Sequence, residues 1–196
     1  MDTVLESGTP AHVVTTVGAD RGLVIVPDIW GLRDLFTEMC HDLAARTGWS
    51  VGSFDPFGGA SLPPAADPEG FPARSAALRE LDDDTLLGDA VSVADRTGCD
   101  SVGLIGFCMG GMYALKAAGT GRFDRVVSFY GMIEVPEDWA GGGQGQPLDA
   151  LARRGSCEVM SVVGTADEWT PPDRVEALEA AGATVLRYEG AGHGFV

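Results

Sequence analysis

Residues 101–111 read SVGLIGFCMGG, and this stretch decides the expected fold. Its first seven residues form an apolar run typical of a buried parallel strand, and the run that follows is typical of a helix ending at Gly119. Between them the chain must turn sharply, and Gly106 and Gly110 leave room for such a turn. The stretch therefore predicts a strand, a tight elbow and a helix, with Cys108 at the elbow.

Cys108 is the candidate nucleophile. At the start of a helix it would lie near the positive end of the helix dipole and near unpaired backbone N–H groups, which favour thiolate over thiol. The same N–H groups suit a developing oxyanion. A simpler interpretation stays open, because a free cysteine is more often a small buried apolar residue. The other three cysteines, Cys40, Cys99 and Cys157, have no close spacing and are interpreted as core thiols.

A nucleophile of this kind needs a base and a group that orients the base, and candidates for both follow later strands. Asp167 comes after the apolar run 158–164, and His193 lies between glycines after the run 184–188. Loops at the carboxyl ends of parallel strands gather at one crevice. Nucleophile, acid and histidine in this order are typical of α/β-hydrolases.

Each partner also has a simpler interpretation. Asp167 could cap the helix that Pro171 and Pro172 begin, and a histidine on the surface needs no catalytic role. The conjunction of all three residues in one order favours a triad of Cys108, Asp167 and His193. The sequence thus predicts nucleophilic catalysis at the ends of three strands.

The chain resembles the dienelactone hydrolase family, the cysteine branch of the α/β-hydrolases. The resemblance rests on the elbow at 106–111, the early strand and oxyanion loop at 24–31, the strand at 126–131, the acid loop at 164–167 and the histidine loop at 190–195. These segments span nearly the whole chain. The family assignment implies an α/β-hydrolase fold and a carboxylic ester hydrolase, similar to carboxymethylenebutenolidase.

The resemblance implies a covalent mechanism on a small, dienelactone-like ester or lactone. Cys108 would attack the carbonyl, His193 would move protons, Asp167 would orient the imidazole, and water would resolve the thioester. The oxyanion would lie between the backbone N–H groups of Met109 and Ile29. The mechanism needs no cofactor.

The family also carries an acidic residue in its early loop that helps to activate the resting cysteine. Asp28 stands at this position, where well-studied members have glutamate, so the side chain is one methylene shorter. The reach changes by about 1.5 Å on covalent bond lengths.

In the family, arginines hold a substrate carboxylate. Arg74 and Arg79 are candidates without a clean motif match, and Arg33 is a third cation near the expected site, although it could equally be a first-turn surface residue. Aromatic residues near the expected crevice are candidates to line an apolar pocket, although such residues are also common in cores: Trp30, Phe57, Phe71, Tyr130 and Trp169.

The length of 196 residues suits one domain, residues 1–196, and alternating apolar runs and amphipathic stretches predict a mostly parallel sheet with helices on both faces. The expected strands are near 12–17, 22–27, 49–54, 101–107, 125–130, 157–164 and 183–189. The expected helices are near 32–47, 84–97, 109–118 and 172–181. Residues 55–72 are expected to form a long loop over the site, and residues 136–147 a mobile one.

Composition excludes several kinds of partner. A net charge of −16 argues against nucleic acid and anionic membranes. No signal peptide or membrane-spanning run is present, which with free thiols suits a cytoplasmic monomer or small homo-oligomer. His12 and His41 are isolated in the sequence, so no metal site is expected. Relatives continue into a C-terminal helix beyond the histidine loop, and without it apolar surface would be exposed.

Of three other functions, the first does not fit the sequence and two stay open. Class I glutamine amidotransferases share the elbow pattern, but their glutamate two residues after the histidine is replaced by Phe195 here. An esterase or thioesterase acting on a neutral substrate would use the same triad. A binding or redox-sensing module would keep Cys108 as a reactive thiol without turnover.

Overall fold

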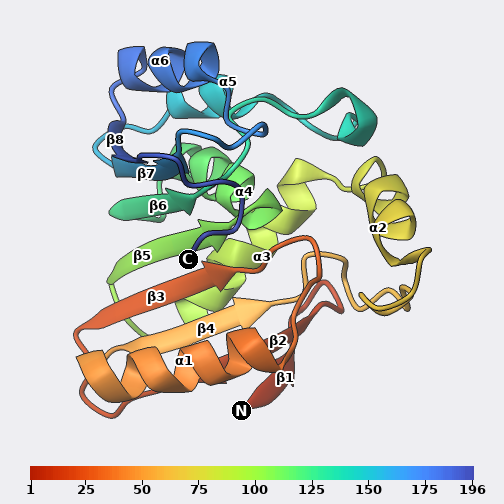
Figure 1. The fold of residues 1–196 in the computed structure, drawn as a ribbon. Helices are drawn as coiled ribbons and strands as arrows, with labels where there is room; N and C mark the ends of the chain where they lie inside the picture. The colour runs from red at the N-terminus through yellow and green to blue at the C-terminus, as the bar shows by residue number, and fades with distance from the viewer.

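Eight strands form a single sheet in the computed structural model, which describes residues 1–196 (Figure 1). The strands are β1 (Asp2–Val4), β2 (Pro10–Val14), β3 (Arg21–Val26), β4 (Ser50–Phe54), β5 (Ser101–Phe107), β6 (Arg125–Phe129), β7 (Glu158–Gly164) and β8 (Thr184–Tyr188). Their order across the sheet is β1-β2-β4-β3-β5-β6-β7-β8. Pairing is antiparallel from β1 to β4 and parallel from β4 to β8.

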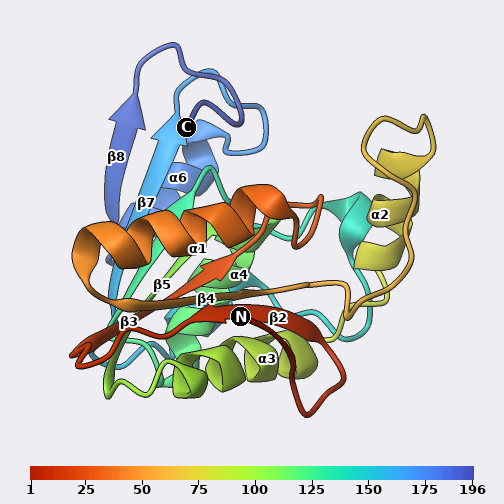
Figure 2. The same ribbon diagram turned by 90° about the horizontal axis from the view of Figure 1, so that it is seen from below.

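Helices cover both faces of the sheet. They are α1 (Asp34–Thr47), α2 (Gly70–Leu78), α3 (Asp83–Arg96), α4 (Met109–Ala117), α5 (Pro147–Leu151) and α6 (Pro172–Ala180), with 3-10 turns at Ala118–Thr120 and Glu137–Trp139. Figure 2 shows α1 and α3 on opposite faces, with α2 projecting beyond the carboxyl ends of the strands. The prediction of a mostly parallel sheet between helices is confirmed.

The two faces bury very different amounts of apolar surface. The core between the sheet and helices α3, α4 and α6 contains 35 buried residues, whereas the core under α1 contains 8. Strands alternate their side chains between the faces, so Val24 and Val26 enter the larger core and Leu23 and Ile25 the smaller. Cys108 packs against both cores, at the boundary between them.

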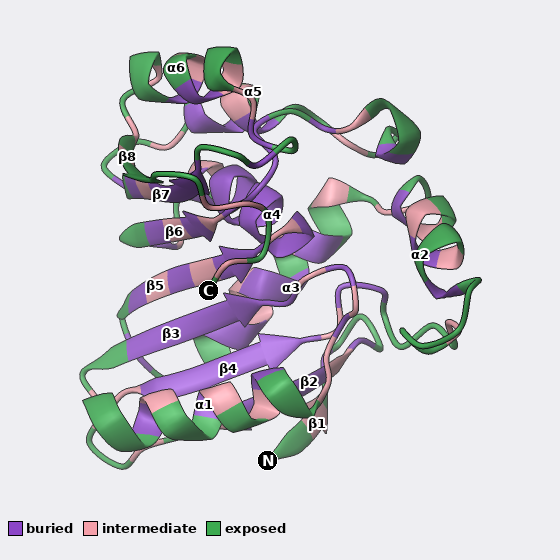
Figure 3. Cartoon of the chain, in the orientation of Figure 1, coloured by how far each residue is buried: buried purple, intermediate pink, exposed green.

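Apolar side chains on the α1 face of β5 to β8 are only partly covered. Ile105, Val127 and Met160 are half-buried, and Leu186 on β8 is 43% exposed. Figure 3 shows β3 and β4 buried along most of their length, whereas β8 is largely open. Part of this face of the sheet is therefore exposed to solvent.

The structure adds three elements that the sequence did not predict. β1 has three residues and α5 has five, too few for a periodic pattern to be recognised. α2 begins at Gly70, so the predicted loop 55–72 ends before its expected boundary. Pro72 lies in the first helical turn, where proline is tolerated, and an alanine-rich run follows it. β2 also begins and ends earlier than the strand expected at 12–17.

Candidate active site

Close backbone packing creates the elbow at Cys108. Cys108 has φ 55° and ψ −119°, a conformation that non-glycine residues rarely adopt, and its N–H donates to the carbonyl of Phe129 at 3.0 Å. A Cβ on Gly106 would lie 2.0 Å from the Gly110 carbonyl oxygen, and one on Gly110 would lie 2.2 Å from the Val26 carbonyl oxygen. The glycines are required because β3, β5 and α4 meet here without room for side chains.

His193 is held by a buried carboxylate. Its Nδ1 lies 2.9 Å from Oδ2 of Asp167, whose side chain is fully buried. The other oxygen, Oδ1, accepts a hydrogen bond from the backbone N–H of Trp169 at 2.9 Å. Because the carboxylate accepts from Nδ1–H, the neutral imidazole keeps its lone pair on Nε2.

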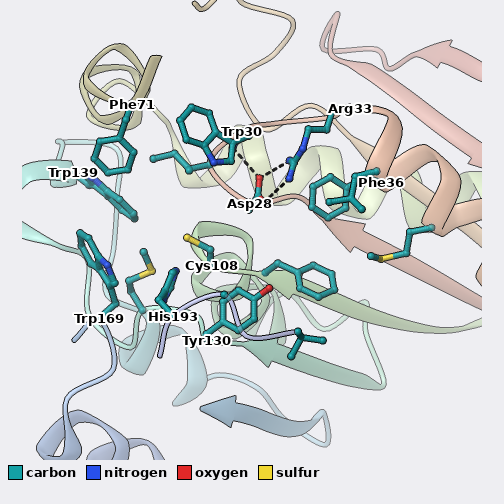
Figure 4. Close-up of a pocket in the computed structure, with 17 residues that line it drawn as sticks. Asp28, Trp30, Arg33, Phe36, Phe71, Cys108, Tyr130, Trp139, Trp169 and His193 are labelled. Atoms are coloured by element: carbon teal, nitrogen blue, oxygen red, sulfur yellow. Dashed lines mark hydrogen bonds and ion pairs between the residues drawn. The ribbon is translucent and has the colours of Figure 1, made fainter. Parts of the chain in front are cut away.

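Cys108 and His193 line one cavity of about 590 Å³ at the carboxyl end of the sheet (Figure 4). Of its 17 lining residues, 13 are hydrophobic, so the cavity favours an apolar ligand. The lining consists of Asp28, Ile29, Trp30, Arg33, Leu35, Phe36, Met39, Phe71, Phe107, Cys108, Tyr130, Met132, Trp139, Trp169, His193, Gly194 and Val196.

The resting thiol is protonated. Burial raises the pKa of the Cys108 thiol to about 12, and the negative charges of Asp28 and Asp167 act in the same direction. The backbone N–H groups of Met109 and Ile29 reach the sulfur and lower its pKa, but by less than burial raises it. The N–H groups at the helix start thus favour thiolate, as predicted, but the loss of hydration outweighs them and leaves the thiol protonated.

Asp28 is bound to Arg33 in the loop between β3 and α1. Nη1 of Arg33 lies 2.6 Å from Oδ1 of Asp28, and Nη2 lies 2.8 Å from Oδ2. The same Oδ1 accepts a hydrogen bond from the backbone N–H of Trp30 at 2.9 Å. Figure 4 shows this pair facing Cys108 across the cavity. Asp28 thus fixes the loop that carries Ile29, and it acts on the thiol through its charge.

The structure does not bring Arg74 or Arg79 into the cavity. Arg74 is buried, donates to the carbonyls of Pro63 and Gly70, and lies 5.1 Å from the centre of the Trp30 ring. Arg79 donates to the carbonyl of Asp138 at 2.7 Å. Of the three candidates, only Arg33 lines the cavity together with Cys108 and His193.

Four of the five expected aromatic residues line the cavity, and Phe57 does not, since it lies in the larger core. Sequence reasoning missed Phe36 and Met39, which are three residues apart on α1 and so share a helix face. It also missed Trp139, which lies in the stretch expected to be mobile. Trp139 is buried and stacks on Trp169 with ring centres 5.3 Å apart.

The side-chain amide of Gln144 holds in place the segment that brings Trp139 to the cavity wall. The side chain of Gln144 donates to the carbonyl of Leu78 at 2.5 Å and to that of Trp139 at 2.9 Å. These bonds tie the glycine-rich stretch to the end of α2. No local sequence pattern marks such a contact, because its partners are 66 residues apart.

The sequence also matches known proteins. The profile of the dienelactone hydrolase family matches residues 9–196. The chain belongs to this family. It is 27% identical over 185 residues to a probable 2-oxo-3-(5-oxofuran-2-ylidene)propanoate lactonase of Bradyrhizobium, covering 88% of this chain and 72% of the relative. It is 28% identical over 193 residues to a carboxymethylenebutenolidase of Rhodococcus opacus, and the match covers 94% of this chain and 74% of the relative.

Solved structures confirm the fold. A crystal structure described as a dienelactone hydrolase, from Klebsiella pneumoniae, superposes with a TM-score of 0.80 at 24% identity, covering 100% of this chain and 87% of the other. Membership of the dienelactone hydrolase family makes the protein a carboxylic ester hydrolase. The structure contains no group of three or more His, Cys, Asp or Glu side chains that could hold a metal ion. No helix has the length and apolar character needed to cross a bilayer.

Proposed function

We propose that this family member hydrolyses a small ester or lactone through a covalent thioester on Cys108. The observation that carries the proposal is the 2.9 Å contact between Nδ1 of His193 and buried Asp167, in a cavity shared with the cysteine at a strained elbow. A nucleophile, a base and a residue that orients the base are the parts this chemistry requires.

In the first step the sulfur becomes nucleophilic only as it reacts. The thiol is neutral at rest, so Nε2 of His193 accepts its proton while the sulfur bonds to the substrate carbonyl carbon. Asp167 stabilises the resulting imidazolium. The new oxyanion is stabilised by the N–H groups of Met109 and Ile29, which already point at the sulfur in the resting site.

The second step releases the product. The tetrahedral intermediate collapses, the carbon–oxygen bond breaks, and the leaving oxygen takes the proton from His193. In a lactone this oxygen stays attached to the acyl group. Water then attacks the thioester while His193 accepts a proton from it, and the carboxylic acid leaves as the proton returns to the sulfur of Cys108.

Two substrate classes fit the cavity. A dienelactone-like substrate carries a carboxylate, and Arg33 is the cation that lines the cavity. Both terminal nitrogens of Arg33 are already bonded to Asp28, and 13 of the 17 lining residues are hydrophobic. These observations favour a second candidate, a neutral ester with an aromatic or short acyl group.

Four free cysteines further suit a reducing compartment such as the cytoplasm.

The test is turnover by the purified protein of a dienelactone, followed by its ultraviolet absorbance, and of a neutral aryl acetate. We expect hydrolysis that is lost in Cys108→Ala and retained in Cys157→Ala, a matched change at a buried cysteine outside the cavity. Rapid acid quenching should trap wild-type protein with the mass of the acyl group added. Hydrolysis that survives Cys108→Ala would exclude the thioester mechanism.

A binding or redox-sensing module gives a different result. It predicts that Cys108 is modified by thiol reagents while neither substrate turns over in folded protein. Substrate-dependent acylation that then decays with time would separate the enzyme from such a module.

A further inference from the structure

Two histidines that are far apart in the sequence meet between α1 and β2, outside the active-site cavity. Nε2 of His12, on β2, lies 3.1 Å from Nε2 of His41, on α1. The rings meet edge to face, with centres 5.0 Å apart. The side chain of His12 is only 9% exposed, whereas His41 is open to solvent. The two residues that appeared isolated in the sequence therefore form one pair.

Asp2 decides where the proton of His12 lies. Its Oδ1 is 2.7 Å from Nδ1 of His12. A carboxylate oxygen accepts hydrogen bonds, so Asp2 is the acceptor in this contact. Nδ1 of His12 must then hold the hydrogen. In neutral His12 the lone pair consequently lies on Nε2, directed at His41.

The distance between the two Nε2 atoms suits a shared metal ion. With Zn–N bonds of about 2.0–2.1 Å, two nitrogens on one ion are about 3.3 Å apart at a tetrahedral angle and about 2.9 Å apart at a right angle. The observed 3.1 Å lies between these values. A carboxylate on the other ring nitrogen is the usual partner of a metal-binding histidine.

We propose that His12 and His41 form a binding site for a divalent transition-metal ion such as Zn²⁺. Both Nε2 atoms would bind the ion, and water would complete the coordination at the exposed side of His41. A neutral His41 takes part by moving its hydrogen to Nδ1, so no other group changes protonation. Imidazole ligands select zinc, nickel or copper rather than magnesium or calcium, and the net charge of −16 attracts cations.

The site would join two parts of the fold. His41 belongs to α1, which follows the loop of Asp28 and Arg33, and His12 belongs to β2 beside β1. The chain between the two histidines includes β3 and the whole of that loop. An ion that binds the folded protein but not the unfolded chain raises the midpoint of thermal unfolding. The metal would therefore stabilise the edge of the sheet.

The test is calorimetric titration of ZnCl₂ into untagged protein near pH 7.5. We expect one ion per chain for wild type and for the control His193→Gln, which removes the catalytic imidazole instead. His41→Gln changes an exposed side chain, so folding should persist, and its affinity should fall at least about tenfold. No binding to wild type, or equal binding by His41→Gln, would overturn the proposal.

A second variant examines the carboxylate. Asp2→Asn should weaken zinc binding by about 10- to 100-fold, because Asp2 orients His12 without touching the ion. MgCl₂ should bind neither protein at this site and should leave the unfolding midpoint unchanged. A midpoint that rises with ZnCl₂ as much in His41→Gln as in wild type would place the ion elsewhere and contradict the assignment.

Discussion

Arg33 donates hydrogen bonds to both carboxylate oxygens of Asp28, at 2.6 and 2.8 Å. Asp28 directly precedes Ile29, whose N–H is expected to stabilise the oxyanion. The Asp28 side chain is 21% exposed, so its charge is only partly hydrated. The pair therefore does two things at once. Arg33 partly offsets the charge of a carboxylate that faces Cys108, and Asp28 fixes the backbone of the loop through the Trp30 N–H.

Arg33→Met tests this positioning role. Losing the guanidinium leaves Asp28 unpaired and loosens the loop of Ile29, so we expect kcat to fall about tenfold for neutral and anionic substrates alike. Arg46→Met, at an exposed position in the last turn of α1, is the matched control and should leave kcat unchanged. Steady-state kinetics on both substrates measure the effect. A selective rise of KM for the anionic substrate would instead assign Arg33 to its carboxylate.

The raised pKa of Cys108 predicts slow alkylation of the resting enzyme. The thiol stays protonated until the pH approaches about 12, so at pH 8 iodoacetamide should react roughly 10²- to 10³-fold more slowly than with a free cysteine. The rate should still be rising at pH 10. Mass spectrometry of the Cys108 peptide measures it, and a rate that levels off near pH 7 would contradict the protonated resting state.

The charge of Asp28 also affects this alkylation. Its negative charge raises the pKa of Cys108, so Asp28→Asn should lower that pKa and speed the reaction. Asp34→Asn, at an exposed position at the start of α1, is the control and should leave the rate unchanged. An equal rate in Asp28→Asn and wild type would show that the carboxylate does not act on the thiol.

Asp167→Asn should reduce kcat by about 10³-fold or more while the protein stays folded. The amide can donate where the carboxylate only accepts, so it favours the wrong tautomer of His193. The neighbouring exposed residue provides the control, since Glu168→Gln should keep wild-type activity. A small loss of kcat in Asp167→Asn would mean that another group orients the histidine.

Two glycine-to-alanine changes, one at the elbow and one in α3, should have opposite effects on stability. A Cβ on Gly110 would lie 2.2–2.3 Å from the carbonyl oxygens of Val26 and Pro27, so Gly110→Ala should lower the free energy of unfolding by about 3 kcal/mol. Gly88 lies in α3 with open space around it, and Gly88→Ala should raise that free energy by about 0.5–1 kcal/mol. Urea denaturation measures both. Equal stability of the two variants would rule out the packing constraint.

The elements recognised from the sequence are those whose signals are local. The buried parallel strands are continuous apolar runs, and the turn at Cys108 needs glycines at fixed positions, so both can be read without knowing the fold. The order of Cys108, Asp167 and His193 follows from the chain alone. The short elements β1 and α5 carry no such pattern, and they were missed.

By itself the sequence determined the fold class, the family and the candidate triad, because strand runs, required glycines and residue order are properties of neighbours along the chain. Tertiary structure alone decided the protonation of Cys108, the pairing of Arg33 with Asp28 and the meeting of His12 with His41. Burial and distance between remote side chains set pKa values and ion contacts, and both arise only once the sheet brings distant segments together.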